Sequence, residues 1–328
     1  MPQRESNARE TLLLESGTLW AKVIDRTAHA LRCGALQPIP TECEFVEQGG
    51  VNFLVRVLPN LARKEEAKKK QDKDSTTTGH VFNPFLPYEE DLFVADISDT
   101  HLCLLNKFNV IDHHLLIVTR EFEEQDTLLT LQDFEAMWAC LAEIDGLAFY
   151  NAGKTAGASQ RHKHLQLVPL PLVPDGLKVP IAPLLASAQF EGSIGTIPGF
   201  PFTHAIAFSL RRRYANGTAQ GAIAQLDSSW LESPREAAAS TLECYHTMLQ
   251  ALGLISESSN RPSGAYNLLA TRQWMLLVPR SLESFESIPV NSLGFAGTLA
   301  VRSEQQLKIL REQGPMTVLR NVAVATAL

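Results

Sequence analysis

The sequence lacks any run of about 20 apolar residues, which is the length that a helix needs to cross a bilayer. Its first ten residues mix acidic and basic side chains without a hydrophobic segment, so they do not have the pattern of a secretory signal. Cysteine is scarce, since the 328 residues include five, and no two of them form a CxxC pair. An odd number of scattered cysteines argues against a disulfide framework. We therefore expect a cytoplasmic protein that does not bind membranes.

An excess of positive charge is also missing. The chain has 29 lysines and arginines against 36 acidic residues, which gives a formal net charge of −7. Such a protein repels nucleic-acid backbones as a whole, so we expect no nucleic-acid partner and only local binding of a polyanion. Hydrophobic residues make up 45% and charged residues 20%, as is usual for a globular protein with an ample core.

Four segments have apolar residues at helical spacing. Thr130 and Asp133 have the spacing of a capping box, and so have Ser233 and Glu236. A glycine stands at the end of each segment or shortly after it and favours the end of the helix. The predicted helices span residues 18–31, 131–144, 234–253 and 303–314, the last of these being the final helix of the chain.

Short apolar runs predict strands at residues 52–58, from Leu92, at 102–105 and at 115–118, with the last two as neighbours. Helices and strands are interspersed without the regular rhythm of a doubly wound sheet, so the fold class is α+β. The lysine- and threonine-rich segment 63–79 is expected to be a mobile surface loop. Residues 170–201, rich in proline, glycine and alanine, are predicted to connect two regions, 1–200 and 201–328.

The stretch from residue 151 to 169 carries most of the chemical information. If it forms a strand, period-two alternation sends His162, His164 and Gln166 to one face. Gly153 and Gly157 before them permit a tight loop whose amides can approach phosphate oxygens. A neutral imidazole can attack phosphorus and so divide one difficult displacement into two easier ones. The pattern favours phosphoryl-group chemistry on a histidine.

Two histidines two residues apart on a strand are also typical of metal sites or occur without a function. A zinc site needs a third and usually a fourth ligand. The histidines that could supply these further ligands are His113, His114, His204 and His246, and their spacing in the sequence does not select any one of them.

The pattern of Asn151, Gly157 and Ser159 followed by His162-Lys-His164-Leu-Gln166 resembles the histidine-triad superfamily. It is similar to the HxHxQ branch, which galactose-1-phosphate uridylyltransferases share with diadenosine tetraphosphate phosphorylases. Glutamine at the third position marks this branch of transferases, whereas triads that end in histidine are largely hydrolases. The resemblance implies a histidine-triad-like antiparallel sheet with flanking helices.

The closer resemblance is to the ATP adenylyltransferases, also named diadenosine tetraphosphate phosphorylases, and it extends over nearly the whole chain. The zinc-type cysteine arrangement of many uridylyltransferases is absent. The segments that carry the resemblance are Asn83–Pro87, Leu105–Phe108, His114–Thr119, Tyr266–Leu269 and Val290–Gly297.

The resemblance implies that His164 is the nucleophile that becomes adenylylated, that Gln166 holds a nonbridging oxygen, and that His162 positions the site. Asn151 would contact the ribose or orient the site. Lys64 resembles a polyphosphate-binding lysine, although a lysine in a charge run is usually solvated. The remaining implied substrate contacts are the phosphate loop, Gly157, Ala158, Ser159 and Gln160; the nucleotide contacts Asn106 and Lys107; and, toward the distal nucleotide, Asn267, Thr271 and Arg272.

The implied reaction is phosphorolysis, in which His164 attacks diadenosine tetraphosphate, ATP departs, and phosphate or sulfate collects the adenylyl group. With phosphate the product is ADP. Region 1–200 would be catalytic, and region 201–328 would pack on it and complete the site in a monomer or weak homo-oligomer. No organic cofactor or resident metal is expected, and Mg²⁺ would arrive with the polyphosphate. The alternatives are a hydrolase or another nucleotidyltransferase of the superfamily, a non-catalytic nucleotide-binding protein, and a zinc-binding structural module.

Overall fold

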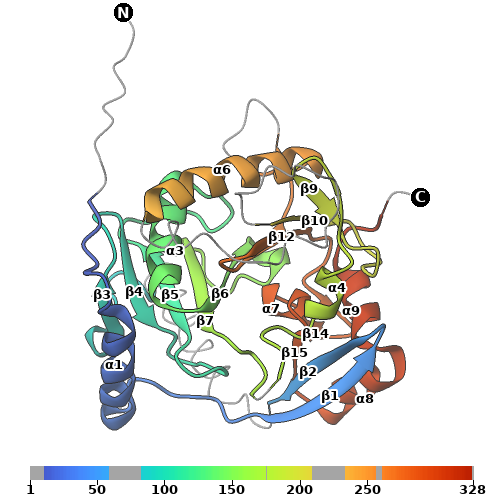
Figure 1. The fold of residues 1–328 in the computed structure, drawn as a ribbon. Helices are drawn as coiled ribbons and strands as arrows, with labels where there is room; N and C mark the ends of the chain where they lie inside the picture. Colours follow the sequence, from blue (N-terminus) through green and yellow to red (C-terminus); the bar gives the residue numbers. More distant parts are fainter. Residues whose placement is uncertain (1–10, 59–82, 175, 209–232, 256–260, 327–328) are drawn as a thin grey trace, which may run out of the picture.

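A ten-stranded sheet forms the centre of the computed structural model, which describes residues 11–58, 83–174, 176–208, 233–255 and 261–326 (Figure 1). Its neighbouring strands are all antiparallel. The fold is therefore α+β, as the sequence predicts. In spatial order the strands are β3 (Phe93–Asp96), β4 (His101–Leu105), β5 (Leu115–Thr119), β7 (His164–Pro169), β6 (Gly146–Ala152), β11 (Tyr266–Ala270), β12 (Trp274–Pro279), β10 (Ala205–Phe208), β9 (Ile194–Thr196) and β8 (Gln189–Glu191).

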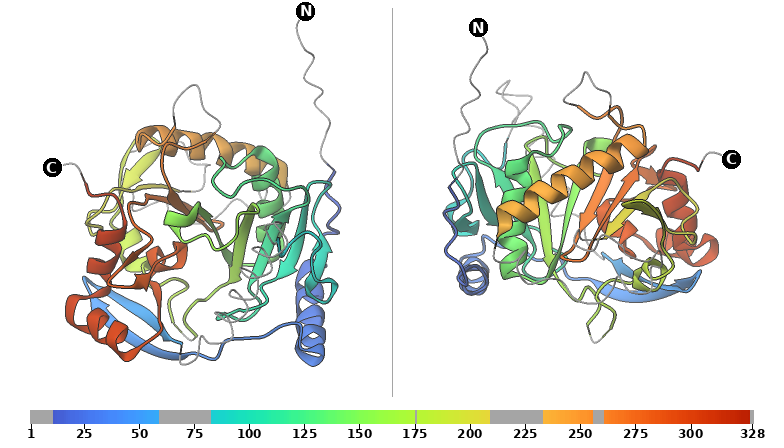
Figure 2. Two further views of the ribbon diagram at one scale, coloured as in Figure 1. Left: turned by 180° about the vertical axis from the view of Figure 1, so that it is seen from behind. Right: turned by 45° about the horizontal axis from the view of Figure 1, so that its top comes forward.

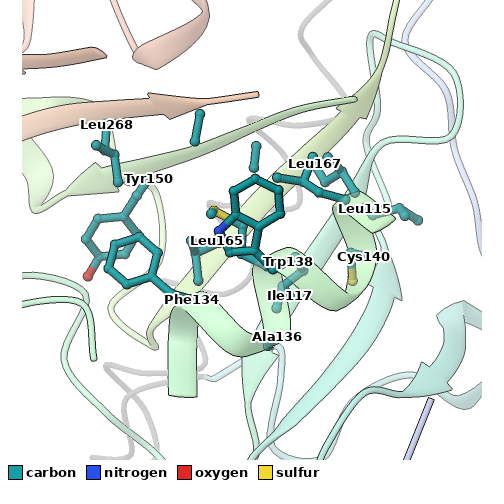
Figure 3. Close-up of a cluster of buried hydrophobic side chains, with 14 of the residues drawn as sticks. Leu115, Ile117, Phe134, Ala136, Trp138, Cys140, Tyr150, Leu165, Leu167 and Leu268 are labelled. Atoms are coloured by element: carbon teal, nitrogen blue, oxygen red, sulfur yellow. The ribbon is translucent and has the colours of Figure 1, made fainter. Parts of the chain in front are cut away.

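One face of this sheet is covered by helices α3 (Leu131–Glu143) and α6 (Pro234–Ala251), which pack against each other, while α1 (Leu19–Cys33) lies beside β3 (Figures 1 and 2). Phe134 and Trp138 of α3 pack among buried residues of β5 and β7 (Figure 3). This core takes the alternate residues Leu165 and Leu167 of β7. The intervening residues of β7 consequently face the other side of the sheet.

The opposite face packs in part on a second layer, which holds a three-stranded sheet in the order β1-β2-β15. In this small sheet β2 pairs in parallel with β15, so an early and a late segment of the chain are joined. The elements of the second layer are β1 (Glu42–Gln48), β2 (Val51–Val57), α4 (Ala182–Leu185), β13 (Ser284–Phe285), β14 (Ile288–Pro289), α7 (Ser292–Phe295), β15 (Thr298–Val301), α8 (Glu304–Gln313) and α9 (Pro315–Val322). The 3₁₀ helices η1 (Glu90–Leu92) and η2 (Lys154–Ala156) precede β3 and follow β6.

The predicted helices all form, but two of their details are wrong. Ser233 forms no side-chain cap hydrogen bond, although the capping box of Thr130 and Asp133 is present. The helix at 303–314 is followed by α9, which begins at Pro315 because proline needs no hydrogen-bond partner for a backbone N–H in a first turn.

The predicted strands also form, and those at 102–105 and 115–118 pair as neighbours. The segment 170–201 is more than a connection, since it contains α4, β8 and β9 and contributes buried side chains to the second layer. The predicted loop 63–79 lies outside the described residues. No helix within the described residues has the length and apolar character needed to span a membrane.

A buried ionic cluster fixes α3 to β7 directly behind the two histidines of the HxHxQ stretch. The Lys163 side chain is fully buried, and its Nζ lies 2.7 Å from Asp133 Oδ2 and 3.1 Å from Glu123 Oε2. His101 Nε2 lies 3.1 Å from the other oxygen of Asp133. Burial raises the pKa of Asp133, but the hydrogen bond with His101 and the Lys163 ammonium outweigh burial and lower it to about 2. Asp133 is therefore ionised at neutral pH.

Replacing Asp133 with asparagine should destabilise the protein, because the fully buried Lys163 Nζ would then lose its closest charged partner. We expect Asp133→Asn to lower the free energy of unfolding by about 3 kcal/mol in urea denaturation. The matched control is Asp96→Asn, which removes an exposed ion pair with Arg120 and should cost less than about 1 kcal/mol. Equal losses in the two variants would contradict the role of the buried cluster.

Candidate active site

His164 is the first residue of β7, and its surroundings determine which ring nitrogen carries the proton. Its Nδ1 lies 2.8 Å from the carbonyl oxygen of His162, and a carbonyl only accepts a hydrogen bond. Nδ1 is therefore the protonated nitrogen, and Nε2 carries the lone pair. Burial of the ring lowers the pKa of His164 to about 4, although the same hydrogen bond opposes this shift. The residue is thus a neutral imidazole with a nucleophilic Nε2 at physiological pH.

Gln166 lies two residues further along the same face, and His114 fixes the orientation of its amide. Asn106 Nδ2 lies 3.1 Å from His114 Nδ1, and His114 Nε2 lies 3.0 Å from Gln166 Oε1. With Asn106 as the donor, His114 Nδ1 accepts and His114 Nε2 donates to the oxygen of Gln166. The Gln166 amide nitrogen is then the group that can donate to a phosphate oxygen. Asn106, which was predicted to meet the nucleotide, acts on this amide through His114.

His162 uses both ring nitrogens within the protein. Its Nε2 lies 2.8 Å from the carbonyl oxygen of Thr119, and its Nδ1 lies 2.9 Å from Asn83 Nδ2. The ring also makes an edge contact with Phe85 of the Asn83–Pro87 segment. Burial lowers the pKa of His162. This arrangement suits the positioning role that the resemblance implies, because His162 holds the strand that carries His164.

Gln125 is a site residue that the sequence reasoning missed. Its Oε1 accepts from His164 N at 2.8 Å, and its Nε2 donates to the carbonyl oxygens of His164 and Asn151, both at 3.1 Å. The backbone pairing between β6 and β7 ends at Phe149 and Gln166. Beyond that pair, the Gln125 side chain takes the place of the missing backbone hydrogen bonds. Gln125 stands in the polar stretch 121–126, which gives no signal of burial.

The carboxy-terminal region holds the loop before the HxHxQ stretch through a buried polar network. Asn151 Oδ1 accepts from Asn267 Nδ2 at 2.8 Å and from Ser292 Oγ at 2.7 Å. Asn267 Nδ2 also lies 2.9 Å from Ala156 O, and Arg280 Nη1 donates to Asn267 Oδ1 at 2.6 Å. Burial lowers the pKa of Arg280 to about 10. Asn267 therefore uses both ends of its amide within the protein, and Asn151 uses its amide oxygen. Both roles that the resemblance implies for Asn151 stay predictions.

The predicted phosphate loop leaves η2 through Gly157, whose φ of +91° lies in the left-handed region. A Cβ atom at Gly157 would come within 2.8 Å of the carbonyl oxygen of Val290, so the close approach also requires glycine. From there Ala158, Ser159 and Gln160 lead to the strand of His164, with Ser159 exposed and the other two half-buried. The backbone N–H groups of Gly157 and Ala158 donate to the carbonyl oxygens of Lys154 and Gly153, so these two residues shape the loop. Ser159 is the exposed donor of the loop.

Three of the predicted contact residues are engaged elsewhere. Lys107 Nζ lies 2.6 Å from Glu89 Oε2. Thr271 caps the turn after β11, and Arg272 donates to the carbonyl oxygens of Leu141 and Ala142 at the end of α3. Thr271 and Arg272 thus use these groups within the protein, and their contact with the distal nucleotide stays a prediction. Lys64 lies outside the described residues.

Within the described part of the chain, no group of three potential metal ligands includes His162 or His164. His204, one of the candidate zinc ligands, accepts from Ile197 N through Nε2 and lies 2.7 Å from Phe202 O through Nδ1. His113 contacts Thr27 on α1. The HxH pair therefore has no zinc-type surroundings among these residues.

Comparison with known proteins agrees with this fold. The Ap4A phosphorylase N-terminal domain model matches residues 9–187, and the ATP adenylyltransferase C-terminal domain model matches residues 198–325 (Ap4A is diadenosine tetraphosphate). The chain is 27% identical over 321 residues to diadenosine 5',5'''-P1,P4-tetraphosphate phosphorylase 2 of Saccharomyces cerevisiae. The aligned region covers 89% of each protein.

Two solved structures of the yeast Ap4A phosphorylase Apa2 have the same fold. The complex with AMP gives a TM-score of 0.71 at 24% identity and covers 96% of this chain and all of that one. The complex with Ap4A gives 0.69 at 22% identity with the same coverage. The protein is thus a nucleotidyltransferase with a histidine-triad-like fold. Its chain belongs to the Ap4A phosphorylase family, with the ATP adenylyltransferase domain as its carboxy-terminal part.

The low pKa of His164 can be measured directly. Because burial disfavours the imidazolium ion, we expect NMR titration of labelled histidines to show His164 neutral down to about pH 4. The His164→Ala spectrum identifies its resonances. The folded-state pKa lies below the ordinary 6.5, so the linked stability is full above pH 6.5 and is lost as the pH falls toward 4. A midpoint near 6.5 in the folded protein would show that the ring is solvated.

The role of Gln125 predicts a kinetic defect without loss of substrate binding. Gln125→Met keeps much of the side-chain volume but removes all three hydrogen bonds, so His164 should shift from its position for attack. We expect kcat to fall about 100-fold with KM little changed, because small displacements of a nucleophile have costs of this size. Gln37→Met, at an exposed glutamine, is the control. A Gln125→Met enzyme with the wild-type kcat would remove Gln125 from the site.

Proposed function

We propose that the protein splits Ap4A by phosphorolysis into ADP and ATP, and also runs the reverse adenylyl transfer, through an adenylyl-His164 intermediate. One observation carries this proposal. His164 is a neutral imidazole whose lone pair is on Nε2, and Gln166, two residues further on the same strand face, has its amide oxygen bound by His114. Membership of the Ap4A phosphorylase family supports the substrate. We propose a cytoplasmic monomer or weak homo-oligomer, in keeping with the free cysteines of the described chain.

In the first step the Nε2 lone pair attacks the phosphorus that carries one adenosine. A P–N bond forms, the P–O bond to the remaining three phosphates breaks, and ATP leaves with the bonding electrons. The adenylylated ring becomes positively charged. The carbonyl oxygen of His162 stabilises this charge through its hydrogen bond with Nδ1–H, which also prevents the ring from rotating.

Gln166 would donate its amide N–H to a nonbridging oxygen of the attacked phosphate, where negative charge grows during the displacement. An amide has no titratable proton, so it cannot activate water as a histidine could. A polyphosphate leaving group also needs little proton donation. A glutamine in place of a histidine at position 166 therefore favours an anionic acceptor such as phosphate over water in the second step.

In the second step a phosphate oxygen attacks the same phosphorus, the P–N bond breaks, and its electron pair returns to Nε2. The product is ADP, and His164 is again neutral. Ser159 and Gln160 would hold the phosphate chain through their donors, with Mg²⁺ entering on the polyphosphate. Gly157 and Ala158 would give the loop its shape, because their own N–H groups donate to Lys154 O and Gly153 O. Sulfate can take the place of phosphate by the same geometry.

Phosphate dependence tests the proposed reaction. We expect Ap4A to be converted into equal amounts of ADP and ATP when inorganic phosphate is present, with little AMP formed when it is absent, as separated by chromatography. Equal rates without phosphate, with AMP as a product, would identify a hydrolase. Binding of Ap4A without any turnover would identify a non-catalytic nucleotide-binding protein.

The covalent step has its own variants. His164→Ala should abolish both turnover and the acid-labile adenylyl label, while nucleotide affinity stays within about tenfold, or 1.4 kcal/mol, because the loop remains. His162→Ala should be milder. His246→Ala, at an exposed histidine of α6, should leave turnover unchanged. Mapping of the label to His162 by mass spectrometry would reverse the assigned roles.

A further inference from the structure

A group of three potential metal ligands lies at the sheet edge formed by β3, away from the HxHxQ strand. His29 and Cys33 stand one turn apart on α1, and Asp91 belongs to η1 just before β3. The ligand atoms of the three side chains all lie within 4.8 Å of one another. Figure 1 shows α1 beside β3 at the side of the molecule, with β4 and β5 between it and β7.

We propose that His29, Cys33 and Asp91 form a binding site for a zinc-type divalent metal ion. Thiolate, imidazole and carboxylate are all ligands of Zn²⁺, and a thiolate disfavours the hard ions Mg²⁺ and Ca²⁺. The thiolate and the carboxylate together balance the charge of the ion. Three protein ligands leave a fourth tetrahedral position for water.

The geometry needs only small side-chain movements. Tetrahedral Zn²⁺, with bonds of about 2.0 Å to nitrogen or oxygen and 2.3 Å to sulfur, places ligand atoms about 3.3 to 3.6 Å apart. In the structure His29 Nε2 and Asp91 Oδ1 are 2.7 Å apart, and the largest separation in the group is within 4.8 Å. The required separations fall inside this range. The i,i+4 spacing on α1 sets two ligands on one helical face before any metal binds.

The two elements that supply the ligands are already held together. α1 packs against both η1 and β3. Arg26, one turn before His29, donates to the carbonyl oxygen of Glu90 at 3.4 Å. The Cys33 and Asp91 side chains are exposed and His29 is half-buried, so an ion can enter without unfolding. A bound ion would therefore connect α1 to the edge of the large sheet.

Binding requires that the Cys33 thiol lose its proton to solvent as the sulfur–metal bond forms, while His29 binds in its neutral form. Cobalt(II) is a suitable probe, because a cobalt–thiolate bond produces a charge-transfer band that bonds to nitrogen or oxygen do not. After chelator treatment and removal of the chelator, we expect one Co²⁺ per chain with this band, displacement of Co²⁺ by Zn²⁺, and a Tm raised by Zn²⁺.

Three variants and one matched control assign the site. Cys33→Ser should abolish the band, and His29→Ala and Asp91→Asn should each weaken binding at least about tenfold. Cys43→Ser, at the other exposed cysteine, should leave the titration unchanged. Ap4A turnover should be the same in Cys33→Ser and wild type, since the site lies outside the proposed catalytic machinery. Binding without the thiolate band, loss of the band in Cys43→Ser, or no binding at all would overturn the proposal.

Discussion

The hydrogen bond between His164 Nδ1 and the carbonyl oxygen of His162 is the interaction on which the proposed chemistry of the molecule depends. It assigns the proton to one nitrogen and leaves the lone pair on the other, while burial keeps the ring neutral. The bond forms only if the backbone between residues 162 and 164 is held in one conformation. Gln125 fixes this backbone through its hydrogen bond with His164 N, and Lys163 fixes it through its buried ion pair with Asp133. Much of the polar interior thus supports this single hydrogen bond.

The two halves of the chain share this task because they share one sheet. β6 pairs with β7 on one side and with β11 on the other, so the strand before the phosphate loop lies between an amino-terminal and a carboxy-terminal neighbour. Asn151, at the end of β6, accepts hydrogen bonds from Asn267 and Ser292. Late residues of the chain therefore hold the loop after β6 in place.

Features that depend on local periodicity could be predicted from the sequence. Alternation along one strand is enough to place His164 and Gln166 on the same face, and apolar spacing with the Thr130 cap is enough for α3. Gln125 could not be found in this way, because a polar residue in a polar loop becomes buried only through partners that are remote in the sequence. Nor does local periodicity indicate that Arg272, a basic residue near a matching motif, donates to the carbonyl end of α3.

Gly157 packs against the carbonyl oxygen of Val290, a residue more than 130 positions later in the chain. Asn267, Arg280 and Ser292 complete the same contact from positions that are also late. During synthesis His164 and its strand emerge long before these partners exist. The loop can take its final shape only after the segment that contains Val290 and Ser292 has left the ribosome. A nascent chain that ends before this segment would thus carry His164 without the contacts that hold the preceding loop in place.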